Sequence, residues 1–135
     1  MNSIFLIGII ALIVLLFVFY FLPFGLYFVA KLTGLNISFI YITGLQFKKI
    51  PAKIIVRGLI IAHKAELKEI TKEKLEKHFK EGGDVDNVIN ALTLAKSNNI
   101  PLKTEDAFKS NLKGIDVIEV IQKAIEIKNN EKSNN

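Results

Sequence analysis

The N-terminal third of the chain is an apolar run that is too long for the core of a small soluble protein. From Ile4 to Ala30 there are 27 residues without a charged side chain, and Lys31 is the only charge between residues 4 and 47. As a single helix, residues 4–30 would extend roughly 40 Å, whereas the hydrocarbon core of a bilayer is about 30 Å thick. We therefore predict a membrane protein.

The apolar run divides into a firm helix over about residues 4–30 and a second segment over residues 32–47. Within the first, Ile4–Leu22 is long enough to span a bilayer alone, and Pro23 is expected to kink or end the helix. A second full span would place Lys31 roughly 10 Å inside the bilayer, at a cost of about 2.5–3.5 kcal/mol near its centre. We therefore expect residues 32–47 to be re-entrant or interfacial, with a hairpin of two spans as the alternative. Residues 1–47 form the predicted anchor, which lacks the basic start of a cleaved signal peptide.

Positive charge follows the apolar run directly. Ten basic and four acidic residues lie between residues 48 and 80, in a chain of net charge +5. Basic residues beside a span mark its cytoplasmic side and attract anionic lipids. We predict that residues 48–135 are cytoplasmic and that four basic residues contact the membrane surface: Lys48, Lys49, Lys53 and Arg57. Because the lysines alternate with glutamates, we expect no binding to nucleic acid.

Cap and stop signals predict about five short helices after the anchor, so the fold class is mainly α. The first, beginning near Pro51, belongs to a basic, amphipathic juxtamembrane segment over residues 48–70 that is expected to lie on the membrane. The others form a small helical domain over residues 71–128, with predicted N-caps at Thr71, Asp84, Thr104 and Asp116. Residues 129–135 have nothing to bury and are predicted to be disordered.

One apolar stripe of this domain is a candidate interaction face, formed at helical spacing by Val85, Val88, Ile89 and Leu92. Such a stripe can dock in the groove of a partner, although packing within its own domain is its commoner use. No catalytic or metal-binding pattern accompanies it: there is no cysteine, and His63 and His78 have no ligand at the spacing that metals require. We expect no enzyme activity and no cofactor.

Several motifs occur in an order that resembles one bacterial family. The chain has K-K-I-P at residues 48–51, A-H-K-A at residues 62–65, G-G-D-V-D-N-V-I-N-A-L at residues 82–92 and L-K-G-I-D-V-I-E-V at residues 112–120. Together with the anchor, these resemble the N-terminal region of the flotillin-like FloA family, over roughly residues 4–125.

The resemblance implies a non-enzymatic protein of membrane microdomains, the bacterial counterpart of lipid rafts. Such proteins self-associate and act as scaffolds for other membrane proteins, so it implies a homo-oligomer in the cell membrane with its soluble part in the cytoplasm. In the family, this region is followed by a band-7 domain and a coiled-coil stretch. Because residues 1–135 hold neither, three interpretations stay open: a shortened relative, a truncated reading frame, or a module whose partner supplies the rest.

Two other hypotheses about function are consistent with the sequence. The chain can be a membrane-tethered helical adapter that binds one protein partner without assembling with itself. It can also be a small pore-forming protein, although the well-capped helices after the anchor do not favour that role. The native size of the protein distinguishes a self-associating scaffold from an adapter. Toxicity on expression distinguishes a pore-forming protein from both.

Overall fold

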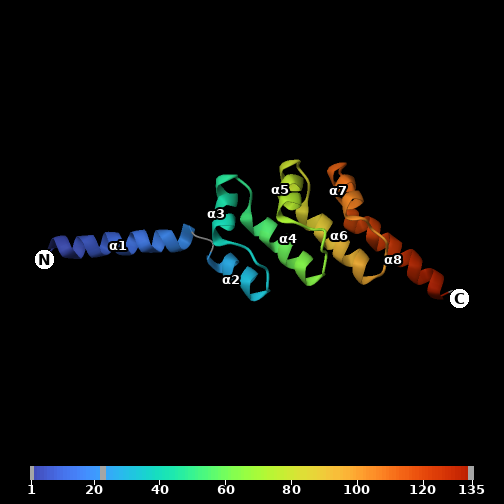
Figure 1. Ribbon diagram of the computed structural model, residues 1–135, viewed down its shortest axis with the longest axis horizontal. Helices are drawn as coiled ribbons and strands as arrows, with labels where there is room; N and C mark the ends of the chain where they lie inside the picture. Colours follow the sequence, from blue (N-terminus) through green and yellow to red (C-terminus); the bar gives the residue numbers. More distant parts are fainter. Residues whose placement is uncertain (1, 22–23, 134–135) are drawn as a thin grey trace.

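The computed structural model describes residues 2–21 and 24–133, and within these ranges it is entirely helical, with eight helices and no strand (Figure 1). This confirms the predicted mainly α class. The helices are α1 (Asn2–Phe21), α2 (Phe24–Leu32), α3 (Phe39–Phe47), α4 (Ala52–Lys64), α5 (Lys72–Lys80), α6 (Val85–Ser97), α7 (Thr104–Leu112) and α8 (Val117–Ser133).

Helices α2 to α8 form a double row. In Figure 1, α4, α6 and α8 follow one another along one side, and the shorter α3, α5 and α7 lie along the other. Helix α6 packs between α4 and α8, and from α3 to α8 each helix also packs on the next helix along the chain. This is the architecture of a helical repeat, in which each hairpin buries its apolar face against the next hairpin.

The backbone repeats with a period of 32 or 33 residues. Three positions with positive φ, Gly34, Glu66 and Asn99, follow the C-terminal ends of α2, α4 and α6 in turn. At each, an amide N–H just beyond the turn donates to the carbonyl of an alanine five residues earlier. This Schellman-type bond satisfies a free helix-end carbonyl, and the three alanines, Ala30, Ala62 and Ala95, are all buried.

The core lies where the two rows meet. Its most buried side chains include Ile42 and Leu45 from α3, Ile55 from α4, Leu75 from α5 and Ile89 from α6.

Gly58 on α4 permits close packing at this point of the core. A Cβ atom there would lie 3.1 Å from Val85 Cγ1 and 3.2 Å from Leu75 Cδ1. The glycine costs about 1 kcal/mol of helix propensity relative to alanine, but it allows α5 and α6 to approach the backbone of α4.

The capping predictions are confirmed at three positions and wrong at one. The Thr71 side chain accepts a hydrogen bond from the amide of Lys74, and Asp84 and Asp116 likewise accept from amides three residues later. At α7 the N-cap is Lys103 rather than Thr104. Thr104 is a helical residue and is buried, so its side chain packs in the domain instead of capping.

The boundaries of the elements differ from the expected ones at both ends of the chain. In place of one helix over residues 4–30, α1 ends at Phe21 and α2 begins at Phe24, and the expected kink at Pro23 falls outside the described residues. Helix α2 packs on α4 and buries Ala30 in the core. At the other end, where the sequence predicts disorder over 129–135, α8 continues to Ser133, and the prediction for 134–135 lies outside the described residues.

The juxtamembrane segment also packs differently from the prediction of a helix lying on the membrane. Helix α4 lies against α2, α3, α5 and α6, and its apolar residues Ile55 and Val56 are fully buried. Residues 48–70 and 71–128 therefore share one hydrophobic cluster with part of the predicted anchor. The apolar face of α4 is buried in the protein's own core, because the neighbouring helices pack on it.

Candidate functional site

Helix α1 presents apolar side chains in every direction. Its 18-residue window Ser3–Tyr20 is long and apolar enough to cross a membrane, and none of it is buried in the structure. The 20 residues of α1 extend about 30 Å, which matches the hydrocarbon thickness. Fourteen residues of the window are Leu, Ile, Val or Phe, and at about 0.3–0.6 kcal/mol each they favour insertion by roughly 4–8 kcal/mol.

The second apolar segment has one face in the core and one face in solvent. In α3, Ile42 and Leu45 are fully buried, whereas Ile40 and Phe47 are more than four-fifths exposed. In α2, Leu32 and Phe28 are also exposed. Because both helices that follow α1 in the chain expose large apolar side chains, they suit the apolar part of a bilayer interface. Their placement in a membrane stays a prediction.

The four predicted membrane-contacting cations lie around the start of α4. Lys53 and Arg57 are exposed and one turn apart on that helix, and Lys49 is exposed in the turn before it with φ of 56°. None of these three side chains forms an ion pair within the described part of the chain. Lys48 differs, because its ammonium is paired with Glu76 although its side chain is 52% exposed.

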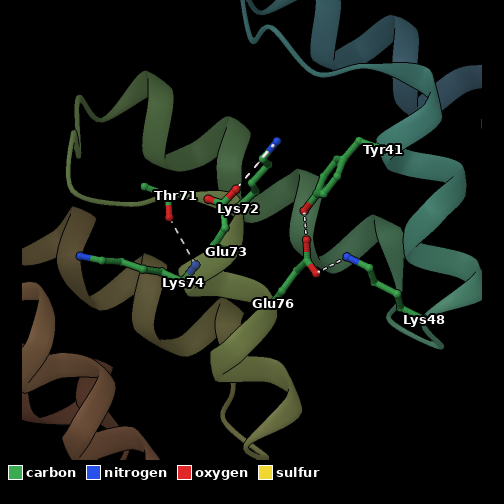
Figure 2. A network of polar contacts seen from close by, with 7 residues as sticks. All are labelled: Tyr41, Lys48, Thr71, Lys72, Glu73, Lys74 and Glu76. Atoms are coloured by element: carbon green, nitrogen blue, oxygen red, sulfur yellow. Dashed lines mark hydrogen bonds and ion pairs between the residues drawn. The ribbon is translucent and has the colours of Figure 1, made fainter.

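The Glu76 carboxylate of α5 joins Tyr41 of α3 and Lys48, the residue that follows that helix (Figure 2). Tyr41 of α3 donates a hydrogen bond of 2.7 Å from its hydroxyl to Oε1, and Lys48 donates one of 3.0 Å from Nζ to Oε2. Lys72 lies 5.0 Å from the centre of the Tyr41 ring, at cation–π distance. The network fastens α3 to α5 across 28 to 35 residues of sequence.

The pKa values of this network reflect its partial burial. Burial raises the pKa of the Tyr41 hydroxyl, and its hydrogen bond to Glu76 raises it further. Burial also acts to raise the pKa of the Glu76 carboxyl, but the hydrogen bonds from Tyr41 and Lys48 outweigh it, so this pKa is lowered overall. Glu76 is therefore an anion at neutral pH, and the salt bridge with Lys48 is present there.

The predicted interaction face of α6 lies inside the protein. Val85, Val88, Ile89 and Leu92 are between 0 and 3% exposed. Their stripe packs where α6 lies against α4, α5 and α8. The periodicity correctly predicts an apolar face, but neighbouring helices cover that face, so it is not available to a partner in this structure.

A polar network around His78 was not anticipated from the sequence. The His78 ring is 2% exposed and packs edge-on to Phe108, with ring centres 4.6 Å apart. Its Nε2 lies 2.9 Å from Asn111 Oδ1, which also accepts from the Asp84 amide. Since Oδ1 is an acceptor in both contacts, Nε2 carries the proton. Nδ1 is buried without a hydrogen-bond partner in the described residues.

This network continues to the start of α8. The Asn111 amide donates to Asn87 Oδ1, Asn87 donates to Asp116 Oδ1, and Asn87 Oδ1 also accepts from the Val117 amide. Burial lowers the pKa of His78, which favours the neutral ring. The network thus joins α5, α6, α7 and α8. Among the described residues, no cluster of three or more metal-ligating side chains accompanies it.

Comparison with protein families and curated proteins gives consistent matches. The model of the family described as "Flotillin-like protein FloA" matches residues 4–132. Proteins named flotillin-like protein FloA are 42% identical over 121 residues in Dictyoglomus turgidum, 40% over 115 in Parabacteroides distasonis and 34% over 119 in Staphylococcus aureus. These alignments cover 90%, 85% and 88% of this chain.

The same alignments cover 37%, 35% and 36% of the three relatives, so the chain spans about a third of their length. No solved structure matches this chain.

Proposed function

The chain belongs to the flotillin-like FloA family, and from that premise we propose that it is a microdomain scaffold of the bacterial cell membrane. In this role it self-associates and gathers other membrane proteins, without catalysing a reaction. The observation that carries the proposal is the combination of family membership with α1, whose apolar side chains face outward.

Membrane residence is the first part of the proposed role. Helix α1 matches the bilayer thickness, and the exposed side chains of α2 and α3 add apolar surface beside it. Lys49, Lys53 and Arg57 are free to meet anionic headgroups, at about 1 kcal/mol for each charge near the surface. They also favour a cytoplasmic location for the helical rows.

Self-association is the second part, and native size tests it. The full chain is extracted from membranes in a mild detergent, and its molar mass is measured by light scattering with the detergent mass subtracted. A large, discrete oligomer is the expected result. A monomer would overturn autonomous scaffolding by these 135 residues and would favour an adapter that binds one partner.

A variant pair tests the anchor separately. Placing lysines at Leu12 and Leu15, near the middle of α1, costs about 2.5–3.5 kcal/mol for each lysine and cancels most of the favourable insertion energy. We expect this variant to leave the membrane fraction on alkaline extraction. The matched control places lysines at Gln122 and Asn130, which are exposed on α8, and it should remain in the membrane. Equal extraction of both variants would contradict the anchoring role of α1.

A further inference from the structure

A cleft lies between α5 and α7, on the row of shorter helices. It has a volume of about 550 Å³ and is lined by residues of both helices and of the turns that follow them. Successive hairpins of a repeat protein create such grooves, which repeat proteins commonly use to bind extended partners. The buried stripe of α6 is covered, whereas this cleft is open to solvent.

The cleft has an excess of positive charge. Four lysines line it, and two of them are neutralised by glutamates within the cleft. Lys74 lies 2.9 Å from Glu105, and Lys77 lies 3.8 Å from Glu81. The other two, Lys109 and Lys113, are exposed and form no side-chain hydrogen bond or ion pair within the described residues. Being four residues apart at the end of α7, they lie on the same side of the helix.

Apolar surface lies next to these free charges. Leu112 stands between the two lysines in sequence and is 41% exposed, and Phe108 forms part of the lining one turn earlier. Of the two ring nitrogens of His78 in the lining, Nε2 binds Asn111, and Nδ1 is buried without a hydrogen-bond partner in the described residues. A ligand that enters from solvent therefore meets two unpaired cations and an apolar patch first.

We propose that the cleft between α5 and α7 binds an acidic protein segment that also carries apolar side chains. Carboxylates of the segment pair with Lys109 and Lys113, and an apolar side chain covers Leu112. A bilayer surface fits less well, because these groups line a cleft between two helices, whereas a flat layer of headgroups meets projecting surfaces first. The partner is thus a peptide rather than a lipid.

This inference rests on the proposed scaffold role only for the identity of the natural partner. It assigns the chemistry by which a scaffold recognises a client: an acidic, partly apolar segment. Whether the cleft binds such a segment is independent of oligomer size, so the two proposals fail separately.

The test uses the full chain in mild detergent and a fluorescein-labelled peptide of about 14 residues made of Glu, Leu and Ala. Binding is followed by fluorescence anisotropy, and a Kd of about 1–100 µM is expected. The double variant K109E/K113E should bind at least about tenfold more weakly. The matched control is K64E/K68E, which reverses two exposed cations four residues apart at the end of α4, neither of them ion-paired within the described residues, and it should bind as the unmodified chain does.

Further probes separate the possible sources of binding. A peptide with Gln in place of Glu, or with Ser in place of Leu, should bind at least about fivefold more weakly. If K109E/K113E melts early, K109Q/K113Q replaces it. Equal weakening by K64E/K68E, equal binding of the Ser peptide, or the absence of binding would each overturn the proposal. Competition by phosphatidylglycerol in the detergent micelles, if K109E/K113E abolishes it, would overturn it as well, because the two lysines would then bind lipid.

Discussion

A single methyl group at Gly83 is expected to disrupt the polar network that joins the last four helices. An ideal Cβ atom there would lie 2.3 Å from His78 Nε2 and 2.4 Å from Cε1. The imidazole ring has no space to move away from this Cβ atom, because it is buried against Phe108 and is hydrogen-bonded to Asn111 through the same Nε2 atom. The G83A substitution therefore expels the ring or shifts the turn between α5 and α6.

The magnitude follows from what the displaced ring loses. The hydrogen bond to Asn111 contributes about 0.5–1.5 kcal/mol, and the edge contact with Phe108 contributes about 0.5–1.5 kcal/mol beyond its burial. With the loss of a buried ring, the expected destabilisation is about 2–4 kcal/mol. For a helical region of this size, each kcal/mol lowers Tm by about 3–6 °C, so G83A should lower it by roughly 6–24 °C.

The assay is thermal unfolding of the full chain in mild detergent, followed by far-UV circular dichroism. Gly82→Ala is the matched control at the adjacent glycine. Its Cβ meets nothing, and its cost of about 1–2 kcal/mol arises only from φ of +86°. In a His78→Ala background the clash is absent, so adding G83A should change Tm by less than about 2 °C. Full additivity of the two substitutions, or an unchanged Tm for G83A alone, would refute the reasoning.

Three further outcomes are expected from the same unfolding measurements. Tyr41→Phe removes the hydroxyl that donates to the Glu76 carboxylate and should cost about 1.5–3 kcal/mol, whereas Tyr20→Phe, at an exposed ring, should cost nothing measurable. Burial lowers the pKa of His78 from 6.5, so the unfolded state takes up the proton first. The contribution of neutral His78 to the free energy of unfolding is fully present above pH 6.5 and is lost as the pH falls below it. H78Q should therefore flatten the pH dependence of stability between pH 7.5 and 5.5. Ile89→Ala leaves a cavity at a fully buried core position and should lower stability by about 2–5 kcal/mol; a loss below 1 kcal/mol would contradict its core placement.

The residues whose roles could be predicted are those whose structure depends on near neighbours in sequence. Thr71 and Asp84 cap their helices through amides three residues away, and these caps are visible in the sequence. The apolar spacing of Val85 to Leu92 likewise predicts one helix face. It does not say whether a partner or the protein's own helices cover that face, because periodicity carries no information about the covering surface.

The repeat was missed for a related reason. Its period of 32 or 33 residues is carried by backbone positions with positive φ, occupied in turn by Gly34, Glu66 and Asn99. Three different residues hide the pattern, although the alanines four residues earlier, Ala30, Ala62 and Ala95, share one identity and could have revealed it. The positive φ therefore repeats at these positions, although the residue type changes.

The sequence by itself determined that one segment can span a bilayer, that positive charge follows the apolar run, and where most helices begin. Each of these depends on the composition of a short window, since hydropathy, charge and capping act over a few residues. Only the tertiary structure decided that Lys48 is bound to Glu76, that His78 is buried in a network, and that Lys109 and Lys113 line an open cleft. These facts depend on pairings between residues about 30 positions apart, which are set by how the hairpins stack.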